Sequence, residues 1–465
     1  MNKFILILFI ISILVSPIKL VAQDEAQLQE LAELFRVDVE YAPTDTYLDY
    51  ISARSSEEFS FQTTFFDQPT DNNVIIPEET ISKILVIAES TLYSAVELKI
   101  LRYIQDIQNT YQCTVVLEIV TNGTAQDIKT LILSHITGLD GVILFGDLPA
   151  AWYEVPNDFN TYGYRSWPCD LYYMDIDGVW QDTDLNGIYD THSGNLSPEI
   201  FVGRISTSHM GLLVDEIVGM NNYLDKNHNF WIGGFNLNNK YGLAYTDEDW
   251  ANYSYFNTDI QYLYGASNYD NYNYYNLATF GKNDYVNNRL DISRYEFIQL
   301  SSHSSYYHHA LSGEVIYAEE IFLVPPKSIG YNLFCCSACR WTSVSPSSTH
   351  GFLGGGYVYN SSQSALVAVG STKTGSMLGF EHFYKPLGNH DSIGIALKKW
   401  WQDYVGSSHS ESEIYWFYGM SIIGDPMINF FRIPPSTPCQ NNGSIIYNTA
   451  TGKFNFCEDG VWVEK

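Results

Sequence analysis

The sequence predicts an α/β protein with a mostly parallel sheet flanked by helices, and three observations support this. Short apolar runs alternate with longer amphipathic segments between residues 84 and 145. The same alternation resumes at about residue 199 and continues to about residue 430. With 465 residues, 45% of them hydrophobic, the chain is long enough for two subdomains with substantial cores. Strand–helix alternation of this kind implies parallel strands joined by crossover helices.

The first subdomain is expected over residues 81–210. Thr124 is expected to cap its second helix, which continues through Ile128 and Leu131. A long acidic loop separates its third and fourth strands. The predicted elements are a strand at 84–87, a helix at 95–111, a strand at 114–117, the helix after Thr124, and strands at 141–145 and 199–202.

The second subdomain is expected over residues 211–432 and carries the candidate catalytic residues. Its last strand ends at Gly370, and Gly424-Asp425-Pro426 turns the chain out of the domain. The predicted elements are a helix at 212–223, a strand at 297–300, a strand entering the cysteine-rich segment at 333, a small-residue segment at 351–356, a strand at 365–369 and a helix at 392–404.

The two ends of the chain predict export and a small additional module. Lys3, an apolar run at 4–15 and small residues up to Ala22 have the order of a signal peptide, so we expect residues 1–22 to be removed and the protein to be periplasmic or extracellular. No later run suits membrane insertion. Residues 23–80 are an N-terminal extension or a propeptide. Residues 433–465 are expected to form a linker and a small β-rich module closed by a Cys439–Cys457 disulfide.

Charge and cysteine content narrow the function. The formal net charge of −29 repels phosphate backbones and anionic lipid, so nucleic acid is not an expected partner. The seven cysteines are an odd number, so an exported chain keeps at least one thiol outside an internal disulfide. The pairing of Cys113, Cys169, Cys335 and Cys336 is left open.

The segment from Leu333 to Arg340 suggests a nucleophilic thiol. It is an apolar strand that leads to Cys339, and a second apolar run at 297–300 leads to His303. Ligands bind outside the carboxyl ends of strands in open α/β sheets, so adjacent strands would bring Cys339 and His303 together as a dyad. His308 and His309 are rival bases farther from the strand end. The alternative is a buried cysteine and a hydrogen-bonded loop histidine.

An acidic loop predicts a structural calcium site. Asp182, Asp184, Asn186 and Asp190 occupy positions one, three, five and nine of the loop, Gly187 stands at position six, and Ile188 would contribute its carbonyl. Position twelve is Ser193 where an EF-hand has glutamate, so Asp175 or Asp177 would complete the coordination. The alternative is a solvated acidic loop.

Seven motifs, in order, resemble the gingipain-type cysteine peptidases, whose catalytic fold is shared with caspases. The resemblance runs from about residue 84 to 431 and implies a caspase-like (caspase-haemoglobinase) fold. The motifs are Phe145-Gly146-Asp147, Asp170-Leu171-Tyr172-Tyr173, Phe201-Val202-Gly203-Arg204, the loop around His303, Ser337-Ala338-Cys339, Val367-Ala368-Val369-Gly370-Ser371-Thr372 and Gly424-Asp425-Pro426.

This resemblance implies a role for each matching residue. Cys339 would be the nucleophile, His303 the general acid/base, and Asp170 the carboxylate that orients the imidazole. The backbone N–H groups of Ser304 and Cys339 would form the oxyanion hole. The family usually has glycine after the histidine, where this chain has Ser304; serine keeps the N–H donor but lacks glycine's conformational freedom.

These inferences predict an exported cysteine endopeptidase that hydrolyses protein or peptide substrates, with Ca²⁺ and without an organic cofactor. The first alternative is an inactive gingipain-like scaffold that serves as a secreted binding or adhesion protein. A second is a hydrolase or transferase acting on a non-peptide acyl group. Residues 194–197 lack the acid that basic-specific family members carry there, so the sequence does not predict a preference for Arg or Lys.

Overall fold

The computed structural model describes residues 46–54, 58–68, 81–160, 162–234, 240–292, 294–345, 347–361, 364–406, 414–431, 445–448, 453–458 and 461–464. The predicted signal peptide and Cys439, half of the predicted disulfide, lie outside the described residues. Much of the 23–80 extension also lies outside them.

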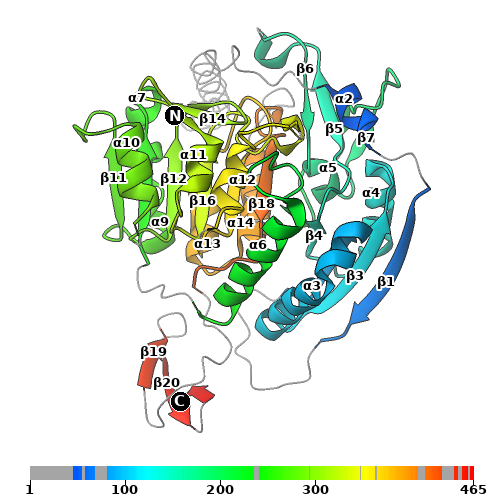
Figure 1. Cartoon of the computed structure of the whole chain (residues 1–465), viewed down its shortest axis with the longest axis horizontal. Coiled ribbons are helices and arrows are strands. Elements are labelled where there is room, and N and C mark those ends of the chain that lie inside the picture. The colour runs from blue at the N-terminus through cyan, green and yellow to red at the C-terminus, as the bar shows by residue number, and fades with distance from the viewer. Residues whose placement is uncertain are drawn as a thin grey trace, which may run out of the picture.

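An eleven-stranded sheet forms the centre of the protein, confirming the predicted α/β architecture (Figure 1). In spatial order its strands are β1 (Ser60–Phe66), β3 (Thr114–Thr121), β2 (Lys83–Glu89), β4 (Gly141–Phe145), β9 (Phe201–Ile205), β18 (Met420–Gly424), β17 (Val367–Ser371), β16 (Gly330–Phe334), β12 (Phe297–Ser301), β10 (Gly242–Thr246) and β11 (Tyr269–Asn273).

Most neighbouring strands are parallel, but two pairs are antiparallel. β1 pairs antiparallel with β3, and β17 pairs antiparallel with β18. Since β18 is parallel to β9, the strands from β3 to β18 run opposite to those from β17 to β11. The carboxyl ends of β12, β16 and β10 therefore share one edge of the sheet, while those of β2, β4 and β9 lie at the other edge.

Helices cover the sheet, and Figure 1 shows α3 and α6 side by side in front of it. Polar residues at helix starts explain several boundaries: Thr124, Asp215 and Ser392 each accept backbone N–H groups as N-caps. The helices are α2 (Tyr47–Ser52), α3 (Ser90–Tyr111), α4 (Ala125–Ser134), α5 (Leu171–Met174), α6 (Glu216–Trp231), α7 (Glu248–Ala251), α8 (Ser254–Thr258), α9 (Gln261–Tyr264), α10 (Lys282–Asp284), α11 (Ala318–Leu323), α12 (Leu353–Val358), α13 (Glu381–Gly388) and α14 (Ile393–Trp400).

Shorter elements complete the described fold. They are the hairpins β5 (Trp152–Val155) with β6 (Arg165–Pro168) and β7 (Val179–Gln181) with β8 (Thr191–Ser193), the sheet of β13 (His303–Ser304), β14 (His308–Leu311) and β15 (Glu314–Tyr317), the C-terminal sheet of β19 (Ile445–Asn448), β20 (Lys453–Glu458) and β21 (Val461–Glu464), and the turns η2 (Asp158–Asn160), η3 (Tyr285–Leu290), η4 (Trp341–Ser343) and η5 (Trp401–Val405).

The two halves of the sheet are joined by pairing and by a buried polar group. Arg204 of β9 pairs with Ile423 of β18. The fully buried Asp425 accepts hydrogen bonds from Tyr103 of α3 at 2.6 Å and Asn227 of α6 at 2.8 Å. Buried carboxylates require such donors, so this residue ties both helices to the end of β18.

The small-residue segment at 351–356 differs from a simple lead into a strand, because part of it forms helix α12. Its glycines permit close packing: a Cβ on Gly356 would lie 2.8 Å from the Ala318 carbonyl oxygen, and one on Gly355 would lie 2.4 Å from the Met210 sulfur. Side chains at these positions would force the helix away from its neighbours.

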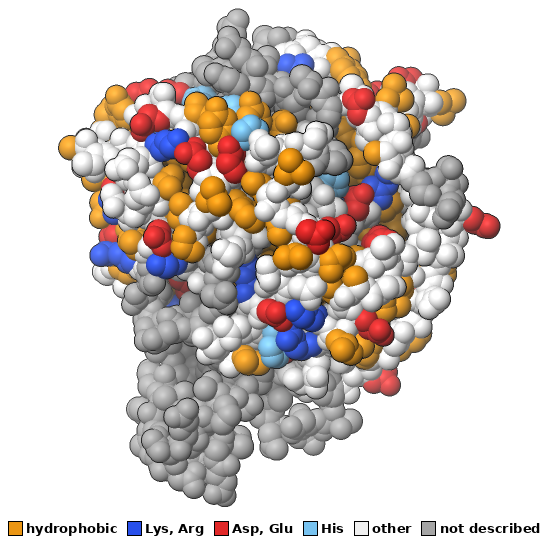
Figure 2. All heavy atoms as spheres, viewed as in Figure 1, with side chains coloured by type: hydrophobic (Ala, Val, Ile, Leu, Met, Phe, Trp, Pro, Cys, Tyr) orange, Lys and Arg blue, Asp and Glu red, His pale blue; other side chains and the backbone are white. Residues whose placement is uncertain are grey.

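On the face drawn in Figure 2, acidic and basic side chains lie next to one another at several places, and hydrophobic side chains are scattered among them. Over α3 and α6, Lys99 and Arg102 both pair with Asp225 at 2.8 Å. Among the described residues, no helix is both long enough and apolar enough to cross a membrane.

Candidate active site

His303 directly follows β12 at the sheet edge that also carries the ends of β10 and β16. Strand β12 consists of buried residues and ends at Ser301, and the next two residues place the imidazole in β13, 8% exposed. Its ring lies 4.6 Å from that of the buried Trp250. The imidazole thus packs against an aromatic ring at the end of β12, the strand end at which the sequence analysis expected it.

The acid at this imidazole is Asp249, from the short helix α7 that follows β10. The His303 Nε2 atom lies 2.7 Å from Asp249 Oδ2. Strands β10 and β12 are adjacent and parallel, with Thr246 paired to Ser301, so the chain leaves both strands side by side. A carboxylate at one ring nitrogen fixes the tautomer and stabilises the protonated ring.

Cys336 follows β16 at the position that matches His303 across the sheet. Ser301 pairs with Phe334, and Ser302 N–H donates to the Phe334 carbonyl at 3.2 Å. Extending the register by two residues sets His303 opposite Cys336. The contacts on either side agree: Ser302 Oγ lies 3.5 Å from Cys335 Sγ, and Ser304 Oγ donates to the Cys336 carbonyl at 2.5 Å.

The thiols of Cys339 and Cys336 both lie in the core, at 0% and 1% exposure, so burial alone does not separate these two cysteines. Ser337 adopts a left-handed φ of 55° and turns the chain, after which Cys339 N–H donates to the Ser371 carbonyl at 2.9 Å. A Cβ on Gly370 or Gly354 would lie 2.9 or 3.0 Å from its sulfur. The side chain is 0% exposed, and burial, with a smaller effect of Cys335, raises its pKa far above the usual range.

Asp170 is bound to a different partner from the one predicted. Its carboxylate accepts from Arg204 Nη2 at 2.7 Å and from Arg204 Nε at 2.9 Å, and both side chains are buried. The Arg204 guanidinium also donates to the Leu148 and Pro149 carbonyls. The structure therefore corrects the assignment of Asp170 to the imidazole: Asp170 ties α5 to β9, and Asp249 occupies the imidazole position.

One of the two predicted oxyanion-hole donors already has a hydrogen-bond partner. The Cys339 N–H already donates to Ser371, so it does not serve as an anion donor in this structure. Ser304 keeps its predicted place beside His303, and its hydroxyl fixes the strand that carries Cys336.

The two rival bases lie in β14. Burial, with a further effect of His350, lowers the pKa of His308 to about 4. Burial, with a smaller effect of His308, lowers the pKa of His309 to about 3. His309 Nε2 contacts the Tyr357 hydroxyl at 3.1 Å, so the residue is part of the polar core.

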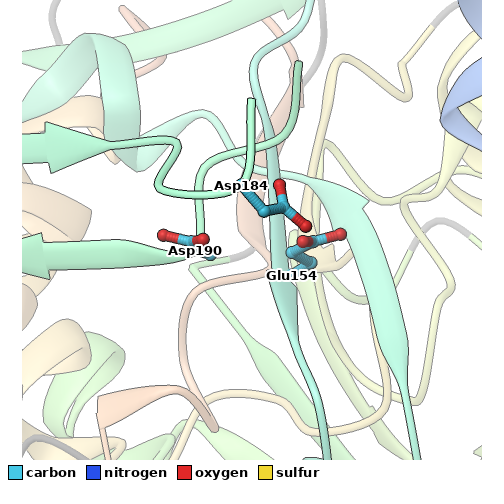
Figure 3. A group of neighbouring side chains, drawn as sticks. All are labelled: Glu154, Asp184 and Asp190. Atoms are coloured by element: carbon cyan, nitrogen blue, oxygen red, sulfur yellow. The ribbon is translucent and has the colours of Figure 1, made fainter. Parts of the chain in front are cut away.

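The acidic loop brings together a set of ligands that differs from the predicted one. Carboxylate oxygens of Asp184, Asp190 and the buried Glu154 of β5 lie within 4.8 Å of one another (Figure 3). Asp182 instead accepts the N–H groups of Asn186 and Gly187 at 3.1 and 2.8 Å. Asn186 donates to Glu154 and Asp184, and its Oδ1 accepts the Ile188 N–H.

This carboxylate group fits a hard divalent cation, since three carboxylates converge around the loop. Asp184 and Asp190 come from the predicted set, and Glu154 is an addition that the loop spacing does not reveal. Asp175 and Asp177 group separately with Glu199. Calcium at the Glu154 group stays a prediction.

Sequence reasoning missed Cys336 and Asp249, although both had a visible signal. Cys336 lies two residues beyond a buried strand, as His303 does, and counting from the two strand ends would have paired them. Asp249 belongs to the acidic helix start Asp247-Glu248-Asp249, which follows the buried five-residue strand Gly242–Thr246. The second subdomain's predicted elements omitted that strand.

A strand-end thiol and a carboxylate-bound imidazole at the carboxyl edge of a parallel sheet are groups that a cysteine peptidase could use. The chain belongs to Peptidase family C25, whose profile it matches over residues 78–431. This confirms the resemblance drawn from the seven motifs.

Solved structures show the same fold at low sequence identity. The Arg-specific cysteine proteinase gingipain R (RgpB) aligns with a TM-score of 0.50 and 13% identity, over 84% of this chain and 93% of that one. The complex of the Porphyromonas gingivalis RgpB pro- and mature domains gives 0.51 and 13%, over 83% and 93%. A structure described as a protease gives 0.52 and 15%, over 83% and 88%. No curated protein sequence matches the chain.

Proposed function

We propose that the protein is a cysteine endopeptidase whose nucleophile is Cys336, with His303 as general acid/base and Asp249 as its orienting carboxylate. One observation carries the proposal: the β12–β16 register sets His303 opposite Cys336, while the His303 Nε2 atom contacts Asp249 at 2.7 Å. Cys339, the nucleophile predicted from sequence, is the competing candidate, and its enclosure between Gly354 and Gly370 counts against it.

The chemistry follows from this arrangement. The Cys336 thiolate attacks the carbonyl carbon of the scissile peptide bond, and His303 gives a proton to the departing amine. Water, deprotonated by the same imidazole, then attacks the thioester and releases the acid. Asp249 stabilises the imidazolium that forms in between. The Ser304 N–H is our proposed donor to the oxyanion, a kind of contact worth about 3 kcal/mol of barrier.

Lys373 adds a cation beside this thiol. Burial lowers the pKa of Lys373, whereas Asp158 and, more weakly, Cys336 act in the opposite sense. The Lys373 ammonium is paired with Asp158 at 3.1 Å, so its charge is largely compensated within the site. His303 is the proton acceptor in this proposal.

We further propose that residues 1–22 direct export and that Glu154, Asp184 and Asp190 hold a structural calcium ion. The first rests on the sequence order of the N-terminus, and the second on the convergence of the three carboxylates. When bound, calcium would fix the loop that packs against β5; no step of the hydrolysis runs through it. A secreted binding protein on an inactive scaffold is the alternative.

Three single variants test the nucleophile. Purified wild-type protein is compared with Cys336→Ala, Cys339→Ala and Cys335→Ala against a fluorogenic peptide library, with unfolding curves as a control for folding. We expect Cys336→Ala to abolish cleavage and the other two folded variants to retain it. Loss of cleavage in folded Cys339→Ala, with activity kept in Cys336→Ala, would return the role to Cys339. A wild-type protein that cleaves nothing would favour the binding alternative.

A further inference from the structure

A pocket of about 400 Å³ opens beside the candidate nucleophile. Ser337, the residue after Cys336, lines it together with Lys373, and the Ser337 N–H donates to the Lys373 carbonyl at 2.9 Å. Trp167 and Tyr164 form aromatic parts of the wall, and Tyr47 of α2 closes one side. Its volume suits one large side chain of a substrate bound at Cys336.

The charged residues that line this pocket are mostly cations. Arg165, Arg340 and Lys373 line it, while Asp158 is the carboxylate among its lining residues. This local excess contrasts with a formal charge of −29 for the whole chain. A pocket with cations along a low-dielectric wall attracts anions.

Asp158 is already neutralised and does not offer a site for a basic side chain. Its carboxylate lies 3.1 Å from Lys373 Nζ, and both side chains are buried at 2% and 3% exposure. The Lys373 ammonium also lies over the Phe159 and Trp167 rings, at 4.4 and 4.7 Å from their centroids. Arg165 acts electrostatically on both members of the pair.

The remaining cations differ in how firmly they are held. Arg340 is buried over the Trp152 ring and donates to the Ser166 carbonyl at 3.0 Å and to Ser343 Oγ at 2.9 Å. Arg165 is half-buried and donates to the Tyr164 carbonyl at 2.9 Å. Arg165 is thus the cation best placed to reach a ligand. Glu154 bonds to two wall residues, Tyr164 and Asn186, but does not line the pocket.

We propose that this pocket receives the substrate residue adjacent to the scissile bond and selects an acidic side chain, Asp or Glu. The proposal rests on the peptidase function argued above, because it places the pocket beside Cys336. It names Arg165 as the specificity-determining cation, with Arg340 as a second, fixed positive charge, since the Lys373–Asp158 pair is neutral overall.

The test compares Glu with Gln and Asp with Asn, two pairs in which the side-chain shape is kept and only the charge changes. Lys and Leu peptides serve as the basic and apolar references. Peptides with Glu, Gln, Asp, Asn, Lys or Leu on either side of the cleaved bond are assayed with the full chain. We expect kcat/KM at least tenfold higher for Glu than for Gln, equivalent to about 1.4 kcal/mol. Arg165→Gln should reduce that ratio severalfold, and the matched control Arg294→Gln, at the Asp270 ion pair, should leave it unchanged.

Binding separates this proposal from the peptidase function. The Cys336→Ala protein is titrated with the same labelled peptides and followed by fluorescence anisotropy, which needs no turnover. Tighter binding of Glu than Gln peptides, lost in Cys336→Ala/Arg165→Gln, supports the pocket even if no peptide is hydrolysed. Equal binding of Glu and Gln peptides, or preference for Lys, overturns it even if the protein proves to be an active peptidase.

Discussion

At the residue scale, the candidate site depends on which residues follow the carboxyl ends of two parallel strands at one edge of the sheet. His303 and Cys336 each follow a buried strand by two residues, and Asp249 reaches His303 from the short helix α7 after β10. Cys339 is only three residues beyond Cys336, yet the left-handed turn at Ser337 sends it beneath β17 and α12. Proximity in sequence therefore says little about which thiol meets substrate.

Substitution of the imidazole and its carboxylate gives a graded prediction. His303→Ala should lower kcat by about 10²- to 10⁴-fold, because general acid/base assistance is lost. Asp249→Asn should cause a smaller loss, since the imidazole remains but its protonated form is no longer stabilised. Steady-state kinetics on variants of confirmed folding measure both. A loss in Asp249→Asn that exceeds that of His303→Ala would contradict the orienting role.

At the element scale, the β14 hairpin and the acidic loop each carry a prediction about stability. Strand β14 holds two neutral histidines, and the loop between β7 and β8 holds carboxylates of one sign close together. Both arrangements make stability depend on solution conditions, through protons in the first and through a cation in the second.

Acidification should destabilise the hairpin. The folded-state pKa values of His308 and His309, about 4 and 3, lie below the unfolded value of 6.5, so the unfolded chain binds more protons. Stability is then fully present above about pH 6.5 and falls as the pH drops toward 4, by up to about 1.4 kcal/mol per unit of pKa difference. His309→Gln keeps a hydrogen-bond partner for Tyr357. In this variant, the melting temperature should fall less between pH 6.5 and pH 4 than it does in the wild type. Identical pH profiles for variant and wild type would refute this.

Removal of calcium should lower the melting temperature, and added Ca²⁺ should restore it. A ligand that binds only the native state stabilises it by about 2.7 kcal/mol at a hundredfold excess over Kd. Glu154→Gln and Asp184→Asn should each abolish the response, whereas Asp225→Asn, at the α3–α6 surface, should keep it. Melting curves of metal-free protein that coincide with and without Ca²⁺ would leave the loop as a solvated acidic surface.

At the scale of the whole molecule, one sheet runs through both predicted subdomains, and Arg204 lies where the halves meet. It pairs with Ile423 across β9 and β18 and holds Asp170 in a buried ion pair. Removal of one partner from such a pair leaves a buried charge uncompensated, which typically costs 3–5 kcal/mol. We therefore expect Asp170 to contribute to stability through this ion pair.

Asp170→Asn tests this expectation. We expect denaturant unfolding to show a loss of about 3–5 kcal/mol, while kcat of the folded fraction changes less than tenfold. Asp225→Asn, which removes an exposed ion pair, provides a control that should cost at most about 1 kcal/mol. A hundredfold loss of kcat with unchanged stability would instead restore Asp170 to the catalytic group.

The sequence by itself determined the α/β class, the family and the strand-end histidine, because hydrophobic periodicity and motif order are local properties that survive without coordinates. It also predicted a nucleophilic cysteine in the segment that follows β16. The tertiary structure decided which side chains meet, because strand register, the left-handed turn at Ser337 and the direction of the two half-sheets are long-range properties. They bring Asp249 to His303 and set Cys336 opposite it, whereas Cys339 packs between Gly354 and Gly370 and Asp170 pairs with Arg204.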